Sequence, residues 1–185
     1  MEGEILAKIR RLQDYLSTSG GTGKLVFPET MYIALNRFDN VSNLRVLELA
    51  RAINGLYFEE FPITLGNCLV YDAPKRPKTI YVQVCRGVDK LRRLAIKMNR
   101  FAVQAGFKPV KGGFNLHVKI AEVKVVKDQS MLQAAVCRLL KVKVGGMTAK
   151  TVKLKKEVAS EGATMYETVH EVKATEFTRF LPKNF

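Results

Sequence analysis

The spacing of apolar side chains divides the chain into helical and extended segments. Between residues 4 and 16 the apolar positions recur at steps of three and four, which predicts an amphipathic helix. The same spacing and a capping residue, Ser42, predict further helices, at residues 43–54, 88–105 and 131–140. Alternating or β-branched runs bounded by turn residues predict strands, at residues 31–38, 61–71, 79–85, 114–126, 148–158 and 164–174.

The order of these elements repeats. Helix, strand, helix, strand, strand occurs twice in succession, which indicates an approximate internal duplication. The simplest architecture is α+β, with two similar αβ lobes, each a small and mostly antiparallel sheet covered by helices on one side. We expect residues 1–185 to form one bilobal domain, with residues 176–185 as a C-terminal tail beyond the last strand.

The composition is that of a globular protein that can fold without covalent or metal cross-links. With 185 residues and 47% apolar side chains, the chain can bury a core without disulfides or a structural metal. The three cysteines form no Cys-x-x-Cys pair and there are two histidines, so we expect no disulfide framework, no metal site and no cofactor. No apolar run is long enough to span a bilayer and no leader pattern is evident, so we expect a cytoplasmic protein without membrane contact.

The net charge of the chain indicates the class of its partner. Lys and Arg number 31 against 17 Asp and Glu, a net charge of +14, which favours a polyanionic partner such as nucleic acid. Between Arg86 and Lys111 the only acidic residue is Asp89. We therefore predict RNA contacts in three basic segments, a loop, one helix and a late strand: Lys75, Arg76 and Lys78; Lys90, Arg93, Lys97 and Arg100; and Lys150, Lys153, Lys155 and Lys156. The alternative is that these are solvated faces without a partner.

Several segments share their order and spacing with a known family. They comprise Val26-Phe27-Pro28-Glu29-Thr30-Met31-Tyr32-Ile33-Ala34-Leu35, Lys78-Thr79-Ile80-Tyr81-Val82-Gln83-Val84, Ala105-Gly106-Phe107 leading into Phe114-Asn115-Leu116-His117-Val118-Lys119-Ile120, Val152-Lys153-Leu154, and Tyr166-Glu167-Thr168-Val169. With these the sequence resembles the two-histidine phosphoesterase superfamily, in its branch of 2′-5′ RNA ligases and RNA 2′,3′-cyclic phosphodiesterases. The resemblance covers roughly residues 5–175 and implies two pseudosymmetric αβ lobes with mostly antiparallel sheets around a central groove.

The resemblance also implies one His-x-Thr pair in each lobe, holding and cleaving a cyclic phosphate. Residues i and i+2 of a strand share a face, so an imidazole and a hydroxyl spaced in this way reach one phosphate. Here Tyr32 and Ala34 occupy the first pair, and the second retains His117 but has Lys119 in place of threonine. One imidazole remains of two, and a tyrosine with an ordinary pKa near 10 is a poor base at neutral pH. The usual N-terminal strand of the family also has no counterpart before the first helix.

Three groove residues keep chemistry suited to a phosphate. His117, Lys119 and Tyr32 are our candidates for binding it, although an open sheet face kept soluble by a histidine and a lysine explains the pattern equally well. We predict no catalytic residue.

Three functions follow from these observations. The first is a catalytically inactive RNA-binding protein, a component of or factor bound to the ribosome, with ribosomal RNA and neighbouring ribosomal proteins as partners. The second is a divergent RNA 2′,3′-cyclic phosphodiesterase or 2′-5′ RNA ligase that uses His117 with Lys119 and Tyr32. The third is a protein-binding module that docks a partner through the basic helix or through the terminal apolar residues, Phe177, Phe180, Leu181 and Phe185.

Overall fold

The computed structural model describes residues 3–19, 21–71, 79–108, 114, 116–160 and 163–175. The helices in this part of the chain are α1 (Gly3–Thr18), α2 (Asn43–Ile53), α3 (Val88–Gln104) and α4 (Gln129–Leu139). The strands are β1 (Thr22–Val26), β2 (Phe61–Tyr71), β3 (Thr79–Arg86), β4 (His117–Val126), β5 (Lys143–Ala149), β6 (Thr151–Ser160) and β7 (Ala163–Lys173). None of the described helices is both long and apolar enough to cross a membrane.

Two antiparallel sheets form the framework. One has five strands in the order β1-β4-β3-β2-β5, and the other is the β6-β7 hairpin. A single bridge between Glu59 and Thr175 ties the end of the hairpin to the segment that enters β2. The predicted α+β class with antiparallel sheets is therefore confirmed.

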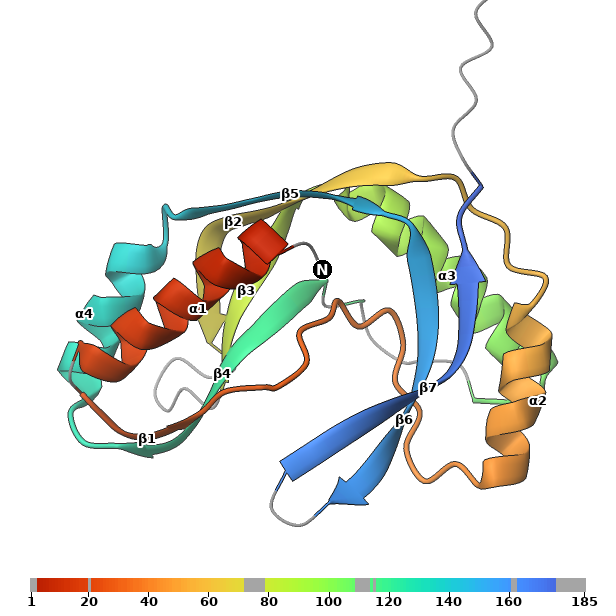
Figure 1. Ribbon diagram of the computed structural model, residues 1–185, viewed down its shortest axis with the longest axis horizontal. Helices are drawn as coiled ribbons and strands as arrows, with labels where there is room; N and C mark the ends of the chain where they lie inside the picture. Colours follow the sequence, from red (N-terminus) through yellow and green to blue (C-terminus); the bar gives the residue numbers. More distant parts are fainter. Residues whose placement is uncertain are drawn as a thin grey trace, which may run out of the picture.

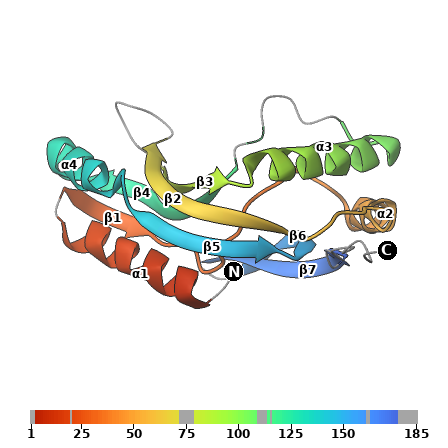
Figure 2. The same cartoon turned by 90° about the horizontal axis from the view of Figure 1, so that it is seen from above.

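The helices lie at opposite ends of the molecule. In Figure 1, α1 and α4 lie with β1 and β4 in one half, and α2 and α3 lie with the β6-β7 hairpin in the other. Seen from above in Figure 2, the long strands β2 and β5 run lengthwise and connect the two halves.

Helix α1 packs on the sheet through one stripe of apolar residues. Its buried side chains include Ile5, Ile9, Leu12 and Leu16, each adding roughly 1.5–3 kcal/mol of transfer free energy when removed from water. One polar residue, Gln13, is buried among them. Its Nε2 donates to the Ile120 carbonyl at 2.8 Å, so the amide is satisfied and α1 is fixed against β4.

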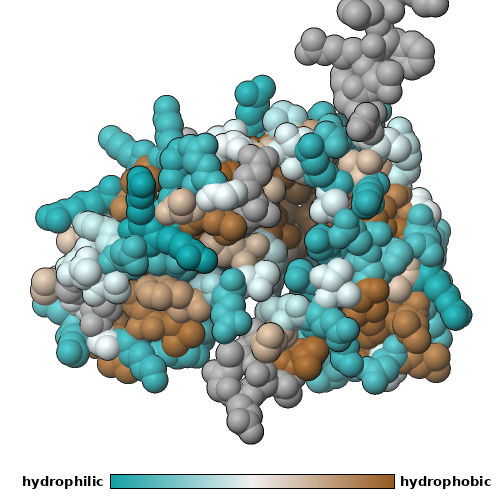
Figure 3. Space-filling model, in the orientation of Figure 1, coloured by the Kyte–Doolittle hydropathy of each residue, from teal (hydrophilic) through white to brown (hydrophobic). Residues whose placement is uncertain are grey.

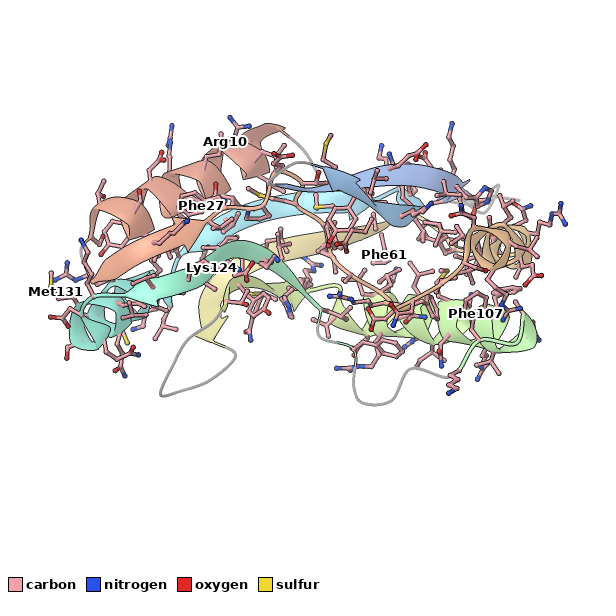
Figure 4. The ribbon with its side chains drawn as sticks, turned by 90° about the horizontal axis from the view of Figure 1, so that it is seen from below. Arg10, Phe27, Phe61, Phe107, Lys124 and Met131 are labelled. Atoms are coloured by element: carbon pink, nitrogen blue, oxygen red, sulfur yellow. The ribbon has the colours of Figure 1, made fainter. Side chains whose placement is uncertain are left out.

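Helix α2 begins at the predicted cap. The Ser42 hydroxyl accepts a hydrogen bond from the Arg45 backbone N–H at 3.5 Å. The Arg45 guanidinium lies 4.4 Å from the centroid of the Phe107 ring, and Phe38 meets that ring edge-on at 5.2 Å. Figure 4 shows Phe107 between α2 and α3. These contacts anchor the chain that precedes α2 to the end of α3.

The turn from β3 into α3 requires a glycine. Gly87 has φ +87°, in the left-handed region, and a Cβ at this position would lie 2.6 Å from the Pro62 carbonyl oxygen. The helix can therefore begin immediately after the strand, with no intervening loop. This brings the N-terminal turn of α3 next to the end of β3.

The sequence-based prediction of strands was wrong in one segment and incomplete in others. Residues 31–38 form no strand, because Pro28 and the turn after it interrupt the pairing with β4, which resumes only at the Ile33–Val118 bridge. Strands β1 and β5 were missed, since their glycines resemble linker residues. The predicted strand 148–158 divides at Lys150 between β5 and β6. Lys75, Arg76 and Lys78, like residues 176–185, lie outside the described residues.

Candidate active site

One backbone bridge brings the two motif segments together. Ile33 pairs with Val118 in antiparallel orientation, so the flanking residues align as Tyr32 opposite Lys119 and Ala34 opposite His117. Side chains alternate between the faces of a strand, and directly opposed residues share a face. Val118 is fully buried and Ile33 packs against the core. The four motif side chains therefore lie together on the opposite, more open face.

Strand β3 widens this face. In its pairing with β4, Tyr81 aligns with Lys119 and Gln83 aligns with His117. Two rows of side chains cross the three neighbouring segments: Tyr32, Lys119, Tyr81 and Ala34, His117, Gln83. We call these six residues the motif face. The sequence analysis missed Tyr81 and Gln83, although buried Ile80, Val82 and Val84 alternate with them and could have indicated their shared face.

The imidazole of His117 is held by an aromatic neighbour. Its ring centroid lies 3.7 Å from that of Tyr81, with the two planes inclined at 60°. The histidine is half-buried, whereas Lys119 is exposed. The face thus combines a positioned group that can accept or donate a proton with a cation that can approach a phosphate.

Tyr32 contacts the β6-β7 hairpin. Its ring meets that of Tyr166 edge-on, with centroids 5.6 Å apart and planes at 75°. Burial of the hydroxyl, followed by interaction with Tyr166, raises the pKa of Tyr32 to about 12, although Arg37 opposes the shift. The phenol is therefore neutral at physiological pH. It can donate a hydrogen bond to a phosphate oxygen, but it cannot act as a base.

The basic segments differ in how far other groups neutralise them. On β6, Lys153 forms an ion pair with Glu171 at 3.0 Å and Lys156 donates to the Asn43 side chain at 2.6 Å. Lys150 is exposed and Lys155 half-buried beside them. The β7 glutamates that face this strand are distant in sequence, so the lysines appeared unbalanced in the sequence alone. On α3, by contrast, Lys90, Arg93, Lys97 and Arg100 are all exposed, and none has an acidic partner in the described part of the chain.

Polar side chains cover much of the molecule. In Figure 3, hydrophilic side chains project over most of the face shown, and the surface is hollowed near the middle, between the two halves. Within the described residues, no group of three or more His, Cys, Asp or Glu side chains could hold a metal ion.

Known proteins resemble this chain both in sequence and in fold. No family model matches the chain. A relative from Aeropyrum pernix named RNA 2′,3′-cyclic phosphodiesterase is 28% identical over 170 residues, covering 92% of this chain and 97% of its own. A protein of the same name from Methanothermobacter thermautotrophicus is 22% identical over 160 residues, covering 85% and 86%. These relatives support the resemblance of the chain to the two-histidine phosphoesterase superfamily.

Several solved structures share the fold. The E. coli LigT structure in its apo form matches with a TM-score of 0.70 at 14% identity, covering 95% of this chain and 93% of the other. The Thermus thermophilus protein TT0787 matches with a TM-score of 0.67 at 16% identity, covering 94% and 93%. The resemblance stated from the sequence is thereby confirmed.

The relatives overturn our first functional hypothesis. Two proteins matching most of the chain carry the name of an enzyme, and nothing connects the chain with the ribosome. The predictions of an inactive, ribosome-associated RNA-binding protein and of a non-enzyme were therefore wrong. Both predictions were based on the residues missing from the two His-x-Thr pairs: the histidine and threonine of the first pair and the threonine of the second. That reasoning ignored the neighbours that the fold adds to the same face, Tyr81 and Gln83.

Proposed function

We propose that this chain is a phosphodiesterase that opens 2′,3′-cyclic phosphates at RNA ends. The observation that carries the proposal is the antiparallel placement of the two motif segments, which gathers His117, Lys119 and Tyr32 on one face. The names of relatives that match nearly the whole chain support the same substrate. RNA is then the partner of the motif face.

The residues of the motif face divide the reaction between them. A water oxygen attacks phosphorus, the bond from phosphorus to one ribose oxygen breaks, and that oxygen must gain a proton. His117 in its neutral form accepts the proton that the attacking water loses. Lys119 holds the non-bridging phosphate oxygens and offsets the negative charge that grows in the transition state.

Tyr32 belongs on the leaving-group side of this reaction. Its raised pKa keeps the phenol protonated at neutral pH, so it can donate to the departing ribose oxygen. A proton held this tightly is transferred late, when the leaving oxygen has become strongly basic. Tyr32 therefore replaces the second imidazole as a donor, but it is a weaker acid than an imidazolium.

Because residue 34 is an alanine, this position provides no side-chain hydrogen-bond donor beside His117. An alanine side chain offers the phosphate nothing where the family pattern has a threonine hydroxyl. The amide of Gln83, on the other side of His117, is the nearest group in the same row that can donate. We assign Gln83 to phosphate binding in this row.

The test uses an RNA of about 12 nucleotides, within the range that one nucleic-acid-binding module covers. The wild-type protein should convert a 2′,3′-cyclic end to a monoester that a phosphatase can remove. The matched control is the same RNA ending in a linear 3′-phosphate, which should remain unchanged by the protein alone. A cyclic end that persists at high protein concentration contradicts the proposal.

A further inference from the structure

A stripe of cations runs along α3. Lys90, Arg93, Lys97 and Arg100 follow one another at steps of three, four and three residues, so they share one side of the helix. From the first to the last they span about 15 Å of helix axis. All four are exposed, while the core side of the helix buries Leu91, Leu94, Ala95, Met98 and Ala102. We call the four cations the α3 stripe.

The charge of the stripe is not neutralised locally. Asp89, the acidic residue of the first turn, pairs instead with Arg92 at 3.3 Å. Glu59 and Glu60, which lie before β2, form no ion pair with the stripe in the described part of the chain. Other exposed lysines do have such partners: Lys8 pairs with Glu4, Lys124 with Glu122 and Lys153 with Glu171.

Aromatic side chains accompany the stripe. The Lys97 Nζ donates to the Tyr57 carbonyl at 3.2 Å, and Tyr57 itself is 59% exposed. The Lys90 Nζ lies 5.8 Å from the centroid of Phe61, a buried ring that fixes the position of the lysine. An exposed tyrosine contributes little to the core but offers a stacking surface. Cations beside an exposed aromatic ring suit single-stranded nucleic acid, whose bases are free to stack.

The stripe begins where the motif face ends. Gln83, in the row of His117, lies on β3, which ends at the exposed Arg86. Gly87 then turns the chain directly into α3, and Lys90 stands in the first helical turn. An RNA chain that extends from the motif face past the end of β3 would reach the α3 stripe.

We propose that the α3 stripe and Tyr57 bind the single-stranded RNA chain upstream of the 3′ end that is processed at the motif face. The inference rests on the proposed function for the position of that end. The phosphates contact the four cations, and at least one unpaired base stacks on Tyr57. A long RNA is then a better substrate than a cyclic mononucleotide, which cannot reach α3.

The first test measures binding without turnover. Fluorescence anisotropy follows a labelled single-stranded RNA of about 12 nucleotides that ends in a linear 3′-phosphate. We plot the logarithm of the association constant against the logarithm of the salt concentration. For the variant Lys90→Gln, Arg93→Gln, Lys97→Gln, Arg100→Gln, the slope of this plot should be smaller in magnitude by about 3, because each contacted phosphate of a single strand contributes roughly 0.7. Its affinity should fall at least tenfold at low salt.

A control variant removes the same number of charges elsewhere. Arg10→Gln, Arg11→Gln, Lys127→Gln and Lys141→Gln change exposed positions outside α3. This variant should keep both the salt dependence and most of the affinity. If the two variants lose affinity equally, only net charge matters and the inference is overturned. Stronger binding of an acidic peptide than of RNA overturns it as well.

The second test concerns Tyr57. Tyr57→Ala should weaken single-strand binding by roughly fivefold or more, the lower end of the effect of removing a base-stacking ring. Tyr57→Phe should retain the wild-type affinity, since it keeps the ring. Equal binding of Tyr57→Ala and wild type, or tighter binding of an RNA duplex than of the single strand, contradicts the stacking role.

Activity measurements distinguish a failure of this inference from a failure of the proposed function. The variant of the α3 stripe should retain wild-type kcat/KM for a cyclic mononucleotide and lose it for the long RNA. If the wild type turns over neither substrate while the α3 variant still loses RNA binding, the proposed function fails and the RNA surface stands. If turnover is present and the α3 variant handles both substrates like the wild type, the inference fails by itself.

Discussion

Under the proposed function, Tyr32 and His117 act on the same phosphate with opposite capabilities. An imidazole can both accept and donate a proton, whereas the phenol of Tyr32, with its pKa raised to about 12, can only donate one at neutral pH. An acid–base pair needs one group of each kind, and its two members need not be of the same residue type. The proposed function accordingly has His117 as the base and Tyr32 as the donor.

The raised pKa of Tyr32 has a measurable consequence for stability. In the unfolded chain the phenol ionises near pH 10, and in the folded protein only near pH 12, so its stabilising contribution is complete below pH 10 and is lost as pH rises through 12. The difference between these two pKa values corresponds to roughly 2.7 kcal/mol, and solvent screening of a ring that is 39% exposed reduces this to about 1 kcal/mol.

Urea unfolding at pH 9 and at pH 12 measures this contribution. The free energy of unfolding of the wild type should fall further between these two pH values than that of Tyr32→Phe, which has no hydroxyl to ionise. The comparison cancels the titration of the other tyrosines and of the lysines. Identical pH dependence of the two proteins would show that the Tyr32 phenol ionises as freely in the folded state as in the unfolded chain.

Residue identities predicted part of the site. The strand spacing in the sequence predicted that His117 and Lys119 share one face, and the family resemblance aligned Tyr32 with the first motif. Nothing in the sequence pairs Tyr32 with Tyr166, because that contact joins segments far apart in the chain. Similarly, the lysines of β6 appeared unbalanced until the hairpin brought Glu171 beside Lys153.

At the scale of elements, β4 organises the molecule. It pairs with β1 and β3, carries His117 and Lys119, and accepts the hydrogen bond from Gln13 of α1. The sequence predicted this strand and the four helices because their apolar periodicity is long and regular. It failed for short strands with glycines, since β1 and β5 contain few apolar positions to establish a period.

The junction between β3 and α3 gives a stability test at this scale. Gly87→Ala forces a residue with a Cβ into positive φ and against the Pro62 carbonyl, so it should destabilise the protein by about 1–3 kcal/mol. The matched control is Gly3→Ala in α1, where a Cβ meets nothing within 4 Å and helix propensity improves.

Thermal unfolding of both variants distinguishes the two environments. Gly87→Ala should lower Tm, and Gly3→Ala should leave it unchanged or raise it slightly. A Gly87→Ala protein as stable as the wild type would mean that the β3-α3 turn can relax. The α3 stripe would then lack a fixed position relative to the motif face.

For the whole molecule, the contact that builds the motif face joins two segments far apart in the chain. The Ile33–Val118 bridge places the first motif segment beside the second. The order of the elements could be predicted from the sequence. The bridge could not be predicted, because it depends on how the chain returns to β4 after the turn that follows Pro28.

If the scaffold is intact, restoring the first family pair should increase activity. The variant Tyr32→His, Ala34→Thr places His-x-Thr in the first segment and keeps Lys119 to hold the phosphate. We expect its kcat/KM on the cyclic RNA end to rise roughly 100-fold or more, the usual contribution of a positioned acid–base group. Adding His117→Ala should abolish the gain. A folded variant without any gain would indicate that the motif face does not hold the phosphate as proposed.

The most direct measurement compares kcat/KM of the wild type and His117→Ala on an RNA with a 2′,3′-cyclic phosphate end. His170→Asn, which changes the histidine on β7, is the matched control. We predict a loss of roughly 10²–10⁴-fold for His117→Ala and less than about twofold for His170→Asn, with both variants folded. Equal rates for the wild type and His117→Ala would contradict the assignment of the motif face as the active site.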